Sequence, residues 1–256
     1  MGEEVLWLSV LPCLLDIGAA MLASGADVRH VERMLERMGY AYGAARMDVF
    51  VITAHMVVTI TLPSGREHTL SRRVESIAAT DFSRLQALDG LCAQCCEQPL
   101  PVDDLRSRLR ALMERQQGTG RLFAGGILAI AAFAVFFGGR WIDAAVAALV
   151  GAFVCYTMKC WRPCFPNYLV YNFATALASG VLIGLAGLAV PGLQSGVIII
   201  GVIMILIPGI PMTNAIRDLI AGDTLTGIMR LVESLLWALA LALGFMAAMV
   251  LTGWVG

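Results

Sequence analysis

The sequence predicts an α-helical membrane protein with five transmembrane helices, preceded by a small α+β cytosolic domain. Two features of composition support this fold class. Hydrophobic residues make up 59% of the 256 residues and charged residues only 14%, which is far from the usual balance of a soluble domain. The charges are also uneven, because residues 1–121 hold 13 of the 18 Lys and Arg and 15 of the 19 Asp and Glu. We therefore expect a cytosolic domain at 1–116 and a transmembrane domain at 117–256.

The N-terminal part shows helical and strand-like patterns in turn. Residues 5–24 repeat apolar side chains at helical spacing, and Asp27 is placed to cap a second helix that ends at Gly39. A stretch rich in Val, Ile and Thr follows, and Pro63 to Arg66 divides it into two runs, which predicts a β-hairpin. Two more helices are expected at 81–96 and 101–116.

The C-terminal part contains uncharged runs that suit membrane spans. A spanning helix needs about 20 mostly apolar residues. The 54 residues between Arg162 and Arg217 carry no charge, and Pro and Gly at 191–196 divide them into two spans. The expected spans are 122–139, 141–158, 168–190, 196–212 and 231–255.

The distribution of basic residues predicts the orientation. With the N-terminal domain in the cytosol, Lys159, Arg162, Arg217 and Arg230 lie in inside loops and only Arg140 lies outside, as the positive-inside rule requires. The C-terminus is then outside. The first residues are acidic, so no secretory signal is expected. Net charge is −2 over residues 1–121 and +1 over the rest, so nucleic acid is not an expected partner.

The strongest candidate for a functional site is a helix break after the fourth span. Pro208 and Pro211 each remove a backbone donor, so a regular helix cannot continue through them. Secondary transporters use such breaks, because the N-terminus of a half-helix offers free N–H groups to an anion. A carboxylate-bearing substrate suits this arrangement, with the substrate-binding or pathway residues Pro208, Gly209, Pro211, Thr213, Asn214 and Arg217. Thr213 and Asn214 are expected in the first turn of the new helix. The alternative is that Pro208 and Gly209 only end the span at the membrane interface.

Charged residues follow the break. Asp218, Asp223 and Glu233 are candidates to carry a coupling proton or gate the site, together with Arg230, which is spaced to pair with Glu233. Because they lie near the ends of spans, interfacial anchoring is the alternative. A polar cluster of Asn167, Tyr168, Tyr171 and Asn172 opens the third span, where Tyr is also a routine interfacial residue.

Other chemistry has little support in the sequence. The seven Cys and three His lack the spacing of a zinc site, so we expect no metal and no cofactor. No nucleophile elbow, phosphate-binding loop or dinucleotide motif is present, and Asp218 and Asp223 are poorly spaced for an intramembrane acid and base. The chain is not expected to be an enzyme, and any transport would be driven by an ion gradient.

Three stretches resemble a known family. "SGADVRHVERMLERMGYAYG" with "MDVFVITAHMVVTITLPSG", and later "PGIPMTNAIRDLIAGDTLTGIMRLVES", are similar to the soluble and membrane parts of the threonine/serine exporter family. Family members are fused, or split into a longer component with the soluble domain and five spans plus a short partner. This chain resembles the longer split component. It departs from the family at His30, where an Arg usually precedes Val-Glu.

The resemblance implies a function, a location and partners. It implies a secondary transporter component in a bacterial cytoplasmic (inner) membrane that exports threonine or serine, coupled to protons. A split relative is linked to succinate, so dicarboxylate export is one alternative. The expected partners are the small-molecule substrate, a short integral-membrane subunit or a second copy of the chain, and the lipid bilayer. A membrane-anchored regulatory or adaptor protein is the alternative of another class.

Overall fold

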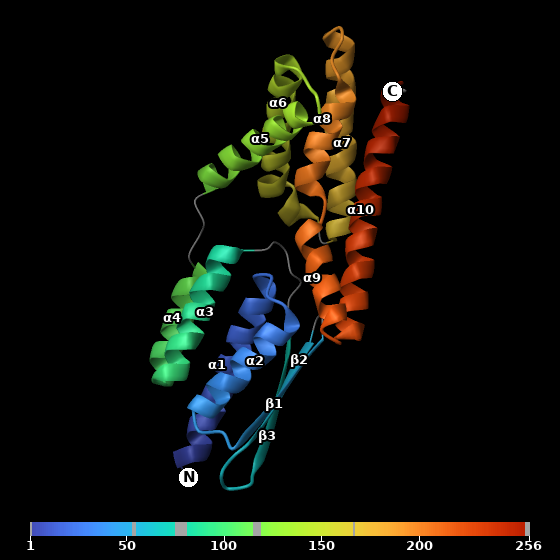
Figure 1. The fold of residues 1–256 in the computed structure, drawn as a ribbon. Helices are drawn as coiled ribbons and strands as arrows, with labels where there is room; N and C mark the ends of the chain where they lie inside the picture. The colour runs from blue at the N-terminus through green and yellow to red at the C-terminus, as the bar shows by residue number, and fades with distance from the viewer. Residues whose placement is uncertain (1, 53–54, 75–80, 115–118, 166, 254–256) are drawn as a thin grey trace. The chain divides into compact units, whose positions relative to one another are not determined.

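The computed structural model describes residues 2–52, 55–74, 81–114, 119–165 and 167–253. The chain divides into two compact units (Figure 1). Unit 1 combines residues 1–116 with 210–231, and unit 2 combines 117–209 with 232–256. The expected boundary after residue 116 therefore coincides with the first division, whereas the segment after the Pro208 break belongs with the N-terminal part. The membrane placement of each unit stays a prediction.

Unit 1 is built from helices and a small sheet. Its elements up to residue 114 are α1 (Gly2–Ala23), α2 (Val28–Ala41), β1 (Arg46–Ile52), β2 (His55–Thr61), β3 (Glu67–Arg73), α3 (Phe82–Glu97) and α4 (Val102–Glu114). The strands form one antiparallel sheet in the order β1-β2-β3. Helix α1 packs against α2, α3, α4, β2 and β3, which explains why it is apolar on all sides.

The sheet differs from the predicted hairpin. The turn at Gly65, with φ +81°, is confirmed between β2 and β3. The run before it is not one strand but two, because β1 and β2 pair with each other and Ile52 lies opposite His55. Residues 53 and 54 lie outside the described residues. The sequence there lacks the Gly, Pro, Asn or Asp that usually mark a turn, so the prediction of a single strand was wrong.

Helix α2 begins as predicted and ends later. The Asp27 side chain accepts a hydrogen bond from the His30 backbone N–H, which confirms the N-cap. The helix continues past Gly39 to Ala41. Gly39 is a packing position, since a Cβ added there would lie only 2.0 Å from Met47 Sδ. The expected helices at 81–96 and 101–116 are confirmed as α3 and α4 over their described residues.

Unit 2 consists of helices. They are α5 (Thr119–Phe136), α6 (Trp141–Cys160), the 3₁₀ turn η1 (Arg162–Cys164), α7 (Tyr168–Ala189), α8 (Ser195–Leu206) and the larger part of α10 (Thr224–Thr252). Helix α5 stops three residues before the expected end of its span, because Gly138 adopts φ +96° and Gly139 N–H bonds back to Ala134 O. Buried Asp143 accepts hydrogen bonds from the backbone N–H groups of Arg140 and Gln194, so it joins the start of α6 to the start of α8.

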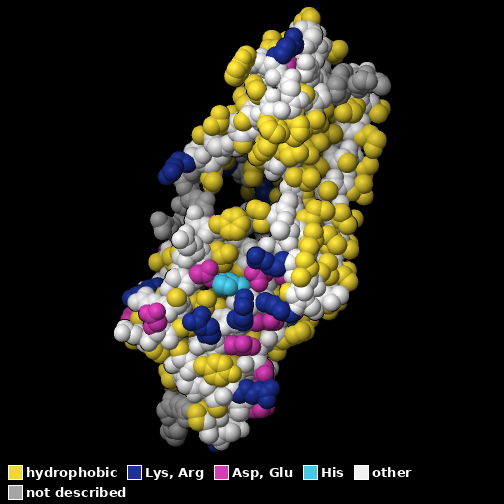
Figure 2. All heavy atoms as spheres, in the orientation of Figure 1, with side chains coloured by type: hydrophobic (Ala, Val, Ile, Leu, Met, Phe, Trp, Pro, Cys, Tyr) yellow, Lys and Arg dark blue, Asp and Glu magenta, His cyan; other side chains and the backbone are white. Residues whose placement is uncertain are grey.

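Several described helices have the length and composition of membrane spans. They are residues Leu6–Ala23 of α1, then α6, α7 and α10, and α8 with α9 (Gly209–Ile220) makes a fifth if the pair is one broken span. Helix α5 is apolar but shorter. Helix α1 contributes to the core of unit 1 and was not among the expected spans, which overlap α5, α6, α7, α8 with the start of α9, and α10 in residue number. The number of spans stays a prediction. On the face in Figure 2, charged side chains gather over unit 1, while the helices of unit 2 show mainly hydrophobic ones.

Candidate functional site

The predicted break separates α8 from α9. Helix α8 ends at Leu206 and α9 begins at Gly209, so the break itself is confirmed. Pro211 is the third residue of α9. The first N–H groups of any helix have no partner within the helix, so Pro211 is tolerated there without a kink. The helix therefore starts two residues before Pro211.

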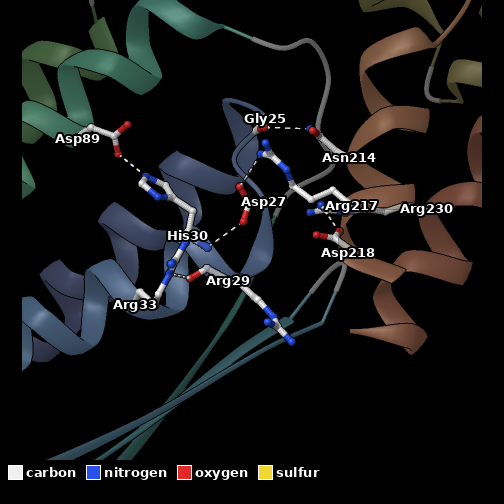
Figure 3. A network of polar contacts seen from close by, with 10 residues as sticks. All are labelled: Gly25, Asp27, Arg29, His30, Arg33, Asp89, Asn214, Arg217, Asp218 and Arg230. Atoms are coloured by element: carbon white, nitrogen blue, oxygen red, sulfur yellow. Dashed lines mark hydrogen bonds and ion pairs between the residues drawn. The ribbon is translucent and has the colours of Figure 1, made fainter. Parts of the chain in front are cut away.

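The early start of α9 moves two candidate residues. Thr213 and Asn214 are the fifth and sixth residues of α9, so the expectation that they lie in its first turn was wrong. Thr213 is exposed. Asn214 Nδ2 donates a hydrogen bond to the carbonyl oxygen of Gly25, at 3.2 Å, in the turn between α1 and α2 (Figure 3).

Arg217 continues this contact with the N-terminus of α2. Its guanidinium lies 3.2 Å from Asp27 Oδ2, and the other oxygen of that carboxylate caps α2 (Figure 3). Asp27 thus binds a backbone donor of its own helix and an arginine of α9. The Arg217 side chain is 67% exposed, so the pair with Asp27 lies in contact with solvent.

Asp218 and Arg230 form a buried ion pair. The distance from Arg230 Nη1 to Asp218 Oδ2 is 2.8 Å, and the side chains are 7% and 2% exposed respectively. The backbone of Val28, the first residue of α2, also hydrogen-bonds to the Asp218 carboxylate. Two carboxylates, Asp27 and Asp218, therefore accept backbone hydrogen bonds at the N-terminus of α2, where negative charge is favoured. The predicted pairing of Arg230 with Glu233 stays a prediction beside this ion pair with Asp218.

The remaining charged candidates lie close by or farther along α10. Asp223, between α9 and α10, accepts from Arg29 Nε at 3.2 Å. Arg33 donates in turn to the Arg29 backbone carbonyl. Glu233 is exposed and belongs to the part of α10 in unit 2. The structure thus brings together four of the charged candidates, Arg217, Asp218, Asp223 and Arg230, around α2.

His30, at the position where the family usually has Arg, contacts a carboxylate. Its Nε2 lies 2.7 Å from Asp89 Oδ1 of α3 (Figure 3). The contact joins the first turn of α2 to α3.

A second polar group lies in unit 2, on α7. Asn172, Thr175 and Ser179 are each at most 1% exposed. Both polar atoms of the Asn172 amide and both hydroxyls lack a hydrogen-bond partner. A buried polar group without a partner costs about 1–3 kcal/mol. Of the three, only Asn172 belongs to the polar cluster predicted from the sequence, although their spacing of three and four residues places all three on one helix face.

Arg162 precedes this polar face in the chain. Its guanidinium lies 4.8 Å from the ring centre of Tyr168 and 6.0 Å from that of Tyr171. Arg162 Nη1 donates to the Phe165 carbonyl, while its buried Nε has no partner. The buried Tyr171 hydroxyl reaches Thr157 on α6 at 3.4 Å. Within the described residues of unit 2, the side chains with a buried, unpartnered N or O atom are Arg162, Asn172, Thr175, Ser179 and Ser195.

Metal ligands and disulfides do not account for either polar group. Among the described residues, no three His, Cys, Asp or Glu side chains gather as metal ligands. All seven cysteines are free. The arrangement provides hydrogen bonds and ion pairs, and its buried charges and orphaned polar atoms lie in or next to apolar helices. Buried ionisable and polar groups in such helices usually mark a path for ions or solutes.

The apolar helices with buried polar side chains, joined to an α+β unit, define a helical membrane protein. A family model described as "Putative threonine/serine exporter" matches residues 13–252. The chain therefore belongs to the threonine/serine exporter family, which confirms the resemblance noted in its sequence.

Two relatives of this chain differ in length and in name. A "Probable threonine/serine exporter" of Mycobacterium tuberculosis is 22% identical over 243 residues, which cover 94% of this chain and 46% of that protein. A "Probable succinate transporter subunit YjjP" of Klebsiella aerogenes is 23% identical over 238 residues, which cover 91% of this chain and 90% of that protein. The chain thus spans about half the length of the mycobacterial relative and most of the Klebsiella one. No solved structure matches the chain.

Proposed function

We propose that this chain is one component of a secondary transporter that exports small carboxylate-bearing solutes, threonine or serine first. The observation that carries this proposal is the family match over residues 13–252, which includes the buried Asp218–Arg230 pair after the helix break. The name of the Klebsiella relative favours one second candidate, export of a dicarboxylate such as succinate.

In this proposal the break and the helix after it form a gate. Pro208, Gly209 and Pro211 set where α9 starts, and Thr213 and Asn214 lie one turn later. Arg217 can exchange Asp27 for the carboxylate of an arriving solute, because its side chain is solvent-exposed and its ion pair is weak. Solute binding at Arg217 would then loosen the contact between α9 and the N-terminus of α2.

Coupling to protons is assigned to the carboxylates near this gate. Asp218 is the leading candidate, with Asp223 and Glu233 as alternatives. A proton on Asp218 would remove the charge that Arg230 and the Val28 backbone hold. The gate would thereby lose its buried ion pair when a proton binds and regain it when the proton leaves. Transport driven in this way needs no nucleotide or metal.

A partner completes the transporter in this proposal. The Klebsiella relative is named a subunit, and the mycobacterial exporter is about twice as long as the matched region. We place the chain in the bacterial cytoplasmic membrane, with unit 1 residues 1–116 in the cytosol and the C-terminus outside. Its partner is a short integral-membrane subunit or a second copy of this chain.

Efflux from preloaded lipid vesicles tests the proposal. Vesicles holding the purified chain, with and without a candidate short membrane partner, are loaded with labelled threonine, serine or succinate, and a pH gradient is imposed in either direction. Efflux that follows the gradient is expected, and the Asp218→Asn variant should lose the dependence on pH. Arg33→Ala, which removes an exposed arginine of α2, serves as control. No efflux of any solute with the partner present would favour an adaptor role instead.

A further inference from the structure

We propose that the polar face of α7 formed by Asn172, Thr175 and Ser179, with Arg162 at its beginning, binds the exported solute along its path. The proposal rests on the proposed transport function and names a subsite within it. The ligand class is a small solute that carries a carboxylate together with hydrogen-bond donors, such as a hydroxy amino acid.

The three side chains lie on one strip of the helix. At about 100° per residue they fall within an arc of about 60°, and they extend about 10 Å along the axis. Ser179 lies about halfway along the 22-residue helix. Transporters commonly bind their solutes near the middle of the membrane, which is where this strip ends.

The strip faces protein and not lipid. On one side of it, Tyr171 reaches Thr157 of α6. On the other side, α7 packs closely on α10, since a Cβ at Gly180 would lie 2.5 Å from Ala248 Cβ. Asn172, Thr175 and Ser179 are each at most 1% exposed, so their polar atoms face the interior of the helix bundle.

The polar atoms without a partner indicate which hydrogen-bonding groups a ligand must carry. The Asn172 amide offers two donors on Nδ2 and one acceptor on Oδ1, and all are without a partner. A fully ionised dicarboxylate supplies only acceptors and would leave Oδ1 unsatisfied. The hydroxyl or ammonium group of threonine or serine supplies the donor that Oδ1 needs. The strip therefore favours hydroxy amino acids over succinate.

Arg162 provides the charge that the strip lacks. Its guanidinium is held over Tyr168 and keeps a buried Nε without a partner. A carboxylate can take a charge-assisted hydrogen bond from this group. Because threonine and succinate both carry a carboxylate, Arg162 attracts either solute, and Asn172 decides between them.

Removal of the two hydroxyls tests the binding strip. Thr175→Val and Ser179→Ala keep the shape of the side chain and should each raise the KM for threonine about three- to tenfold, with little change in maximal rate. The same changes should leave the thermal midpoint of the solute-free protein unchanged or raise it by about 2–4 °C, because an unsatisfied buried hydroxyl is lost. Thr157→Val is the matched control, since that hydroxyl is equally buried but already bonded to the Val154 carbonyl.

Replacement of Asn172 tests selectivity. Asn172→Leu should lower threonine transport strongly and reduce its preference over succinate by at least tenfold. An unchanged KM in all three variants would overturn the proposal while leaving transport intact, as would a wild type that moves succinate and excludes threonine. If the wild type moves no solute, the proposed function fails separately. Equilibrium binding of labelled threonine to the solubilised protein then tests the binding strip by itself. Binding to the wild type that is lost in the variants supports the proposal, and no binding to the wild type overturns it.

Discussion

Charged side chains gather at the first turn of α2. Asp27 and Asp218 both accept backbone N–H groups there, and each also faces an arginine, Arg217 or Arg230. The positive end of a helix stabilises such carboxylates. The two ion pairs differ in burial, so we expect them to contribute differently to stability. The buried Asp218–Arg230 pair stabilises the fold, whereas the exposed Arg217 can exchange Asp27 for another carboxylate.

The buried pair should be far more sensitive to mutation than the exposed pairs around it. Arg230→Ala leaves the buried carboxylate of Asp218 without its arginine, and we expect a loss of about 3–5 kcal/mol in unfolding free energy. Arg29→Ala removes a pair whose arginine is 52% exposed, and should cost at most about 1 kcal/mol. Chemical denaturation in detergent measures both. Equal losses in the two variants would contradict this ranking.

Glu32 should make stability depend on pH. Burial raises the pKa of Glu32 from 4.5 to about 7; the Val51 N–H and Arg29 oppose the rise, and Asp223 and Glu36 add to it. Between these two values the folded chain binds more protons than the unfolded chain, so stability falls as pH rises from about 4.5 to 7. Glu32→Gln keeps the acceptor for Val51 and should melt higher than wild type at pH 7.5 but alike at pH 4. A thermal scan across this range that shows parallel curves would refute the expectation.

Sequence reasoning found those residues whose signal is local. Asp27 was predicted because a cap lies next to its helix. The partners of Asn214 and Arg217 could not be predicted, because they lie 189 and 190 residues away in the chain. Thr175 and Ser179 were missed because single hydroxyl residues are common in apolar helices, and only burial without a partner sets them apart.

Helices α7 and α10 approach each other through glycines on both sides. A Cβ at Gly184 would lie 2.6 Å from Thr252, and one at Gly244 would lie 2.6 Å from the Phe173 carbonyl. Small residues allow such close approach where apolar surroundings provide little hydrophobic force. Nothing in the local sequence of α7 identifies α10 as the helix that packs against these glycines.

Filling this contact should weaken unit 2. Gly180→Val places new methyl groups where a Cβ alone would already meet Ala248 and Phe245, and overpacking of this kind costs about 1–3 kcal/mol. Gly125→Val on α5 is the matched control, because Gly125 has nothing within 4 Å of an added Cβ. Thermal unfolding in detergent should separate the two variants. A fall in midpoint for Gly125→Val alone would argue against the α7–α10 contact.

The elements themselves were largely predictable, and their ends were not. Two prolines predicted the break before α9, yet the helix starts at Gly209 because a proline in a first turn loses no hydrogen bond. Gly39 looked like a helix stop but makes room for Met47. In both places the residue type alone did not determine where the helix begins or ends. Backbone hydrogen bonding determined the start of α9, and packing accounts for Gly39 within α2.

The orientation of the whole chain can be tested with its own cysteines. Cys160 and Cys164 are exposed, in the connection that the positive-inside rule assigns to the cytosol. A membrane-impermeant maleimide should therefore leave them unlabelled in intact cells and label them after permeabilisation. Gln194→Cys, with the native cysteines removed, is the control and should label in intact cells. The reverse pattern would invert the proposed orientation.

Unit 1 is discontinuous, and this has a consequence for the order of folding during synthesis. The hydrogen bond between Gly25 and Asn214 joins residues 189 apart. At ~5–20 residues per second, the ribosome takes about 10–40 s to cover that interval. During this time the first 116 residues can form their helices and sheet, but the N-terminus of α2 lacks Asp218. The contacts of Asn214 and Asp218 with the N-terminus of α2 are therefore among the last in unit 1 to form. They can form only after most of the apolar helices of unit 2 have been synthesised.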